Sequence, residues 1–325
     1  MIRKTRIEYI YTPPKGSYID KILNFDEVTT FVLRSNRDDP RYIDKIVNGI
    51  VVKSCEAPYL ETYDSDNLCH KTLFRYGKYL AIFNVDGDIT LINVSTLEIS
   101  HTISSSNMNK KDDPLRNIHF ASYNYDTEEL YVGMYAFNKV NTSAQCLSKA
   151  VIQKQSIFSL NKEKKFLFDQ CKPLSLDKYP FTWGQKAPLS PESEWLNINA
   201  LMAKGESVFV HTNGGCSTRL GRGERFEFNF ISKLDLNFNW RENVEIEEGF
   251  GNFSSDSNYF ILHSRKKRNK LLFYNADSYK VDFDISLTAK QNLGIQKNQW
   301  LKFDFCNEQL FVYNSLFLNI CKLVK

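Results

Sequence analysis

A phrase of three short strands recurs along this chain and constrains its fold more than any other feature. In residues 79–103, apolar and polar residues alternate up to a turn at Asp86-Gly87, alternate again after it, and resume after a second polar turn. Residues 259–287 repeat this order of strand, polar turn, strand, short polar turn and strand. A sheet of three or four strands cannot bury both of its faces alone, so repeated copies must stack on one another.

Other stretches of alternating apolar residues extend this pattern over the chain. They predict sheets over residues 18–63, 79–103, 118–168, 196–240, 250–287 and 299–325. Asn48-Gly49 indicates a hairpin in the first sheet, because both central residues of a type I′ turn need positive φ. We expect strands at 118–123, 130–137, 151–160 and 165–168 in the third sheet, and at 207–211, 225–231 and 234–239 in the fourth, with a Gly-rich connection from Asn213. Residues 190–204 could instead hold one short helix.

The two ends of the chain predict that the sheets close into a ring. The last segment holds at most three strands, whereas Ile2–Tyr11 reads as an isolated strand that Pro13-Pro14 terminates. Pairing this strand with the last sheet would hide the final edges. The predicted fold is therefore an all-β propeller of six or seven blades, in a single domain over residues 1–325. A two-sheet sandwich would not predict recurrence of the three-strand phrase.

Composition limits the class of partner and the compartment. The 42 Lys and Arg against 38 Asp and Glu leave a net charge of +4, which is too small to indicate a nucleic-acid or membrane surface. The seven cysteines are scattered, odd in number and without a CxxC pair, which is typical of reduced cytosolic proteins. Because there is no signal-peptide core and no apolar run of about 18 residues, we expect a soluble cytoplasmic protein that is monomeric apart from its partner.

The phrase DGDITLINVSTLEI at residues 86–99 resembles the second half of a WD-repeat blade, in which an Asp-Gly turn leads into a strand, a dipeptide and a polar turn. Asn93-Val94 stands where the Trp-Asp pair of that family would be. Residues 273–285 have the same outline, with Asn275-Ala276 at that place, and neither copy has an upstream Gly-His pair. The resemblance implies a propeller whose loop-rich faces and channel dock partners, most often proteins. A propeller of this outline without a catalytic signature also looks like some immunity proteins of bacterial toxin systems.

Three groups of residues are candidates for contact with a protein partner. They are Tyr179, Phe181 and Trp183 in the long Pro-containing segment 172–195, the basic run Arg265, Lys266, Lys267 and Arg268, and the acidic residues Glu242, Glu245, Glu247 and Glu248. Aromatic residues on long loops dominate many interfaces, and the glutamates could cap a basic nuclease toxin. Each group also has a structural interpretation: a covered hydrophobic rim, a solvated turn that blocks edge pairing, and a solubilising surface.

No sequence pattern indicates a catalytic, cofactor or metal site. The five histidines are far apart, the glycines between residues 214 and 223 fit neither phosphate-binding motif, and no Ser has a GxSxG setting. We therefore predict a non-catalytic propeller that binds a protein, most specifically an immunity protein that neutralises a cognate toxin. Two alternatives stay open. One is a propeller hydrolase or lyase that acts on a small or sugar-like substrate through carboxylates from several blades, and the other is a nucleic-acid-binding scaffold that uses the basic run.

Overall fold

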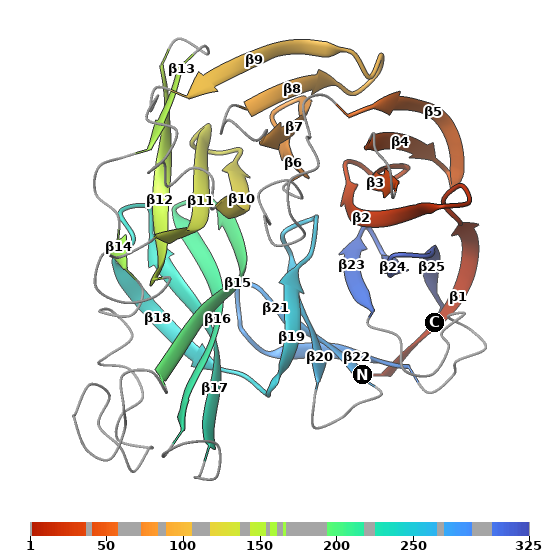
Figure 1. Cartoon of the computed structure of the whole chain (residues 1–325). Coiled ribbons are helices and arrows are strands. Elements are labelled where there is room, and N and C mark those ends of the chain that lie inside the picture. The colour runs from red at the N-terminus through yellow and green to blue at the C-terminus, as the bar shows by residue number, and fades with distance from the viewer. Residues whose placement is uncertain are drawn as a thin grey trace.

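The structure is a computed structural model in which all described elements are β-strands. It describes residues 2–36, 41–57, 73–83, 89–105, 118–136, 144–153, 157–160, 165–166, 194–217, 225–264, 270–287 and 301–324. The described strands form six four-stranded antiparallel sheets around a common centre (Figure 1). We number these sheets 1 to 6 in chain order. Consecutive sheets touch through their innermost strands, as β2 does with β6 and β15 with β19.

Each sheet is a meander of consecutive strands, except that the last one borrows the N-terminal strand. Sheets 1 and 2 contain β2 (Ser17–Asn24), β3 (Thr29–Asn36), β4 (Tyr42–Val47) and β5 (Ile50–Glu56), then β6 (Leu73–Tyr76), β7 (Tyr79–Phe83), β8 (Ile89–Asn93) and β9 (Ile99–Ser105). Sheets 3 and 4 contain β10 (Ile118–Asn124), β11 (Glu129–Ala136), β12 (Ala144–Gln153) and β13 (Ile157–Leu160), then β15 (Glu194–Lys204), β16 (Ser207–Ser217), β17 (Arg225–Asp235) and β18 (Trp240–Glu245). The short β14 (Lys165–Phe166) pairs with β12.

Sheets 5 and 6 show how the ring closes. Sheet 5 contains β19 (Gly249–Phe253), β20 (Tyr259–Ser264), β21 (Lys270–Asn275) and β22 (Val281–Ser286), and sheet 6 contains β23 (Lys302–Cys306), β24 (Gln309–Tyr313), β25 (Leu318–Val324) and β1 (Ile2–Tyr11). The strand β1 pairs antiparallel with β25 along most of its length, so the predicted closure by the N-terminal strand is confirmed. The propeller fold is confirmed with it. The described residues account for six sheets, while the total number of blades and the single domain stay predictions.

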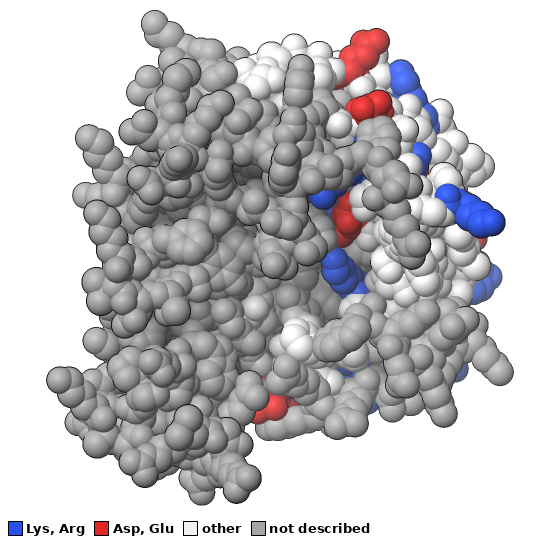
Figure 2. Space-filling model, in the orientation of Figure 1, with Lys and Arg blue, Asp and Glu red and all other residues white. Residues whose placement is uncertain are grey.

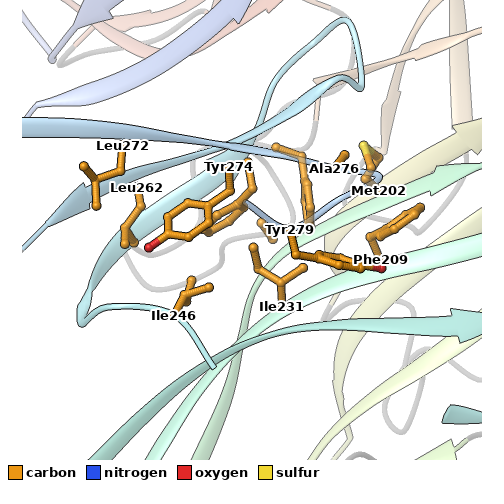
Figure 3. Close-up of a cluster of buried hydrophobic side chains, with 12 residues drawn as sticks. Met202, Phe209, Ile231, Ile246, Leu262, Leu272, Tyr274, Ala276 and Tyr279 are labelled. Atoms are coloured by element: carbon orange, nitrogen blue, oxygen red, sulfur yellow. The ribbon is translucent and has the colours of Figure 1, made fainter. Parts of the chain in front are cut away.

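Buried apolar side chains hold neighbouring sheets together all the way round. Six clusters each lie between two adjacent sheets, and the cluster between sheets 6 and 1 joins Ile19 and Ile22 to Phe311. Figure 3 shows the cluster between sheets 4 and 5, where Tyr279 lies beside Phe209 with ring centroids 6.4 Å apart. Because burying one such side chain contributes about 1.5–3 kcal/mol, packing between sheets rather than any single sheet stabilises the ring.

The repeated phrase folds into the same turn in sheets 2 and 5. Asn93 Oδ1 accepts hydrogen bonds from the backbone N–H of the two residues after Val94, at 2.8 and 3.2 Å, and Asn275 Oδ1 does the same at 3.0 and 2.9 Å. In each turn a buried apolar residue follows with positive φ, Leu97 at 54° and Tyr279 at 56°. The side-chain amide oxygen of this Asn therefore fixes the turn in both sheets.

A buried carboxylate ties three sheets together near the centre of the ring. Asp304 on β23 accepts hydrogen bonds from Asn24 Nδ2 of sheet 1 at 2.7 Å, from the backbone N–H of Phe305 at 2.7 Å, and from both the backbone N–H and the hydroxyl of Ser255 beside β19. Burial nevertheless raises the pKa of Asp304 to about 6, and these hydrogen bonds only partly oppose the shift. The four donors join sheets 1, 5 and 6 at one side chain.

An ion pair fastens the end of β1 to sheet 1. Arg34 Nε donates to Asp44 Oδ2 at 2.7 Å, and the hydroxyl of Tyr11 donates to the same oxygen at 2.5 Å. Arg34 and Asp44 are only 7% and 2% exposed, and the Arg34 guanidinium lies 4.4 Å from the ring centroid of Tyr42. Burial, and then the neighbouring carboxylate, raise the pKa of the Tyr11 phenol. This network reinforces the closure of the ring, because Tyr11 belongs to sheet 6.

Several strand boundaries differ from the predictions. The expected strand at 151–160 is divided between β12 and β13, and the expected strand at 234–239 is a turn, because β17 runs on to Asp235 before Asp235 Oδ1 caps it. The suggested helix at 190–204 is wrong, since residues 194–204 form β15. The Gly-rich segment from Asn213 is partly strand, because β16 continues to Ser217. In β15 and β16, packing in a long antiparallel sheet outweighs the local propensity for a helix or a turn.

Candidate protein-binding surface

The outermost strands of the six sheets differ in whether another strand pairs with them. The outermost strands of sheets 5 and 6, β22 and β1, pair with each other in parallel, and so do β9 and β13 of sheets 2 and 3. Each of these pairings joins two residues of one strand to two of the other, so it protects part of both edges. The outermost strands of the other two sheets, β5 and β18, have no strand beyond them in the described residues. Two sheet edges of the described ring are therefore open to a further contact.

The two open edges differ in chemistry. The edge strand β18 exposes charged side chains, among them Arg241, Glu242 and Glu245. Charged side chains of this kind discourage pairing with another chain. The edge strand β5 exposes three aliphatic residues in a row instead: Ile50 is 67% exposed, Val51 43% and Val52 56%. Adjacent residues of a strand point to opposite faces, so β5 leaves apolar surface uncovered on both of them.

Residues of β1 extend this apolar surface beside the hairpin that leads into β5. A Cβ atom on Gly49 would lie 2.1 Å from Cγ of Tyr9, so the Tyr9 ring packs directly on the glycine of the β4–β5 turn. The positive φ values of Asn48 and Gly49, 50° and 79°, confirm the predicted type I′ hairpin. Tyr9 and Ile10 are 38% and 63% exposed. We define the β5 patch as Tyr9, Ile50, Val51 and Val52.

The surroundings of the β5 patch are polar but only lightly charged. The Lys53 ammonium donates to the backbone oxygen of Thr96 in sheet 2 at 2.5 Å, which fixes this end of β5 against its neighbour. The register between β4 and β5 shifts between Lys45 and Ile46, which leaves Val52 as the extra residue of a bulge. On the side of the molecule where β1 and β5 lie, Figure 2 shows mostly white surface with scattered charged residues of both signs. The patch can therefore bind apolar side chains, with little electrostatic selection.

Of the predicted contact residues, the structure describes only the four glutamates. Glu242 and Glu245 are exposed on β18, whereas Glu247 and Glu248 follow the strand and are half-buried. Glu247 turns inward, because its Oε2 accepts a hydrogen bond from the Ser264 hydroxyl at 2.8 Å. The aromatic residues Tyr179, Phe181 and Trp183 and the basic run Arg265, Lys266, Lys267 and Arg268 lie outside the described residues. A binding role for these groups stays a prediction.

A polar cavity of about 330 Å³ lies between the turns of sheets 5 and 6. It is lined by Asp256, Asn258, Tyr259, Asn275, Asp277, Phe305, Asn307 and Glu308. Its carboxylates are engaged locally: Asp256 Oδ1 accepts from the Ser254 hydroxyl at 2.6 Å, and Glu308 pairs with Arg3 at 2.7 Å. In these contacts, Asp256 orders a turn and Glu308 takes part in a surface ion pair.

Two further searches concern the described residues only. No group of three or more His, Cys, Asp or Glu side chains in them is arranged to hold a metal ion. No helix in the same residues is long and apolar enough to cross a membrane.

Sequence reasoning missed the β5 patch for a physical reason. Ile50, Val51 and Val52 form a short aliphatic run, and such a run normally marks a strand that is buried on both faces. The run belongs instead to an outermost strand, which only the order of strands in the sheet reveals. The Asn48-Gly49 hairpin placed the strand correctly but could not say which edge of the sheet it would occupy.

The chain matches no protein-family model, and none of the curated proteins matches it. Two solved structures are similar in outline. The WD40 domain of Neurospora crassa Pan2 has a TM-score of 0.47 and 9% identity, over 93% of this chain and 74% of that one. The glutaminyl cyclase of Myxococcus xanthus has a TM-score of 0.40 and 8% identity, over 100% of this chain and 99% of that one. Similarity at this level carries no argument about activity, and the propeller fold stands on the ring of sheets described above.

Proposed function

We propose that this protein is a non-catalytic β-propeller that binds a partner protein through the β5 patch. The observation that carries the proposal is the exposure of Ile50, Val51 and Val52 on an edge strand that no other described strand covers. Contiguous exposed apolar residues are a feature of protein–protein contact sites. Full burial of an exposed Val or Ile side chain contributes about 1.5–3 kcal/mol, and these three are roughly half exposed, so covering each contributes about 1 kcal/mol to binding.

The partner that fits this surface presents apolar side chains to both faces of β5. An extended segment laid along β5 would do so, because it could also use the unpaired backbone groups of the edge. The same ring already joins outer strands in this way, through the parallel pairs β22–β1 and β9–β13. In its most specific form, the proposal is a cytoplasmic protein that neutralises a cognate bacterial toxin. That finer form rests on the outline of the sequence alone.

The test is affinity capture of partners with matched surface variants. Ile50→Asp and Val52→Asp each place a charge in the patch, and we expect both to abolish capture of a stoichiometric partner that the unaltered protein retains. Val281→Asp is the control, because Val281 is 45% exposed on β22, outside the patch. Circular dichroism and thermal unfolding of all variants establish that each remains folded. Equal capture by the unaltered protein and both patch variants would contradict the proposal, as would a loss of capture in Val281→Asp alone.

Sedimentation of the purified protein tests whether the β5 patch binds a different protein or a second copy of this chain. A partner protein predicts a monomer at all concentrations when the protein is alone. A concentration-dependent dimer that Ile50→Asp abolishes would mean that a second copy of this chain covers the patch, and it would overturn the proposed heterologous partner.

A further inference from the structure

The turns that join the first and second strands of the six sheets form one continuous surface. We call this surface the turn face, and its residues are 25–28, 77–78, 125–128, 205–206, 254–258 and 307–308. In sheets 3 to 6, hydrogen bonds join each turn to the next: from Gly205 N–H to Asp126 Oδ2 at 2.9 Å, from Lys204 Nζ to the backbone oxygen of Ser257 at 3.2 Å, and from Asn307 N–H to Asp256 Oδ2 at 3.4 Å. These contacts hold the turns in a fixed arrangement.

Arg75 on β6 makes the same connection across sheets 1 to 3. Its Nη1 donates to the backbone oxygen of Phe25 at 2.8 Å, and its guanidinium lies 4.3 Å from the ring centroid of Phe25 and 5.0 Å from that of Tyr125. Tyr125 is 50% exposed, and Val28 in the same turn as Phe25 is 49% exposed. Tyr and Arg are among the residues that dominate the energetics of protein interfaces. This part of the turn face therefore offers apolar and stacking contacts to a partner.

Acidic side chains dominate the turn face, although the whole chain has a net charge of +4. The six turns contain one basic residue, Lys78, and seven acidic residues, which are Asp26, Glu27, Asp126, Glu128, Glu206, Asp256 and Glu308. All of the acidic residues except Asp256 are exposed. Arg3, Arg75 and Lys204 contact the turns from the strands, and the negative charges still outnumber the positive ones when they are counted. The turn face therefore attracts a cationic partner and repels a polyanion.

The polar cavity of about 330 Å³ lies on the turn face, because Asp256 and Glu308 belong to its lining. Tyr259 and Phe305 also line it, with ring centroids 5.6 Å apart. Arg3 already places a guanidinium nitrogen 2.7 Å from Oε2 of Glu308. A Lys or Arg side chain that entered the cavity would meet carboxylates and aromatic rings together, and both kinds of group bind such cations.

We propose that the turn face binds a Lys- and Arg-rich segment of a partner protein. The cations of the segment face the acidic turns, and its aliphatic parts pack on Tyr125 and Val28. A nucleic acid would bring phosphates to an acidic surface, and no group of described carboxylates, His or Cys is arranged to hold a metal ion. The turn face shares no residue with the β5 patch, so this inference does not depend on the proposed function.

The test is fluorescence anisotropy of a short fluorescein-labelled peptide of alternating Arg and Gly residues, titrated with the full chain. The same peptide with Glu in place of Arg is the control ligand. We expect saturable binding of the Arg peptide that weakens when sodium chloride is raised from about 50 to about 200 mM, because salt screens exposed charges. The Glu peptide should not bind.

Matched variants locate the binding surface. Glu27→Gln combined with Glu128→Gln removes two charges from the turns on either side of Arg75 and should weaken binding of the Arg peptide about tenfold. Tyr125→Ser leaves the charge unchanged and should weaken binding about threefold. Glu56→Gln combined with Glu245→Gln is the control, because it makes the same change of charge at exposed residues of the outermost strands β5 and β18.

Circular dichroism establishes that each variant remains folded. The proposal is overturned if the Arg peptide does not bind, or if the Glu peptide binds equally well. It is also overturned if neither the turn-face double variant nor Tyr125→Ser binds the Arg peptide more weakly than the control variant does.

Discussion

His211 should make the propeller sensitive to acid. It lies on β16 at 0% exposure, with its ring centroid 4.6 Å from that of Phe260 in sheet 5, and neither ring nitrogen has a hydrogen-bond partner in the described residues. Burial lowers the pKa of His211 from 6.5 to about 3, and nearby Asn229 opposes the shift only in part. The folded state thus favours the neutral imidazole, while the unfolded chain takes up a proton below pH 6.5.

The sign and size of the effect follow from this difference. Because the unfolded state binds more protons between pH 6.5 and 3, the contribution of His211 to the free energy of unfolding is present above pH 6.5 and is lost as the pH falls. At about 1.4 kcal/mol per pH unit, the loss is about 2 kcal/mol at pH 5 and about 5 kcal/mol once the pH is below the folded pKa. A loss of this size is a large part of the stability of an ordinary domain.

Urea unfolding of the unaltered protein and His211→Leu at pH 7.5 and pH 5.0 measures this contribution. The leucine fills a similar volume without titrating, so the difference between the two proteins should shift by about 2 kcal/mol in favour of the variant as the pH falls. His101→Leu, which removes a partly exposed imidazole on β9, serves as the control. A difference between His211→Leu and the unaltered protein that does not change with pH would refute the reasoning. His211→Gln provides the same comparison if the leucine variant does not fold.

Three further predictions concern the groups that close the ring. Arg34→Met should lower the free energy of unfolding by about 3–5 kcal/mol in urea titrations, because it leaves the carboxylate of Asp44 buried without its ion pair. Asp304→Asn should destabilise more at pH 4.5 than at pH 7.5, by about 2 kcal/mol. The reason is that a folded pKa raised to about 6 gives stability that is present at low pH and lost as the pH rises through 6. Gly49→Ala should lower the thermal midpoint, because its Cβ would meet the Tyr9 ring and its φ is +79°.

For each of these three predictions, one outcome would contradict the reasoning. An Arg34→Met variant as stable as the unaltered protein would show that Asp44 finds another partner or takes up a proton at little cost. A pH-independent effect of Asp304→Asn would remove the claim that burial dominates over the four hydrogen bonds. Gly16→Ala is the control for the glycine, because Gly16 has φ +87° but open space around its Cβ. If both alanine variants shift the midpoint equally, contact between Tyr9 and the hairpin contributes nothing.

Most strands and several turns of this fold could be predicted from the local sequence. Alternation placed most strands, and Asn48-Gly49 placed a type I′ hairpin, since few residue pairs tolerate positive φ at both positions. The shared outline of 86–99 and 273–285 reflects one turn structure, in which Asn93 and Asn275 accept the same backbone hydrogen bonds. Prediction from local sequence failed at β15 and β17, where long strands run through residues whose pattern resembles a helix or a turn.

Residue patterns along the chain were enough to predict that small sheets must stack, and the leftover strand Ile2–Tyr11 indicated how the stack would close. These features depend on residues that are close in the sequence, or on the number of strands, and both are visible in the amino-acid sequence. Contacts between sheets set which edges stay open, which polar groups converge on Asp304, and how deeply the imidazole of His211 is buried. Those properties depend on contacts between sheets, and alternation along a single strand does not encode the order in which the sheets meet.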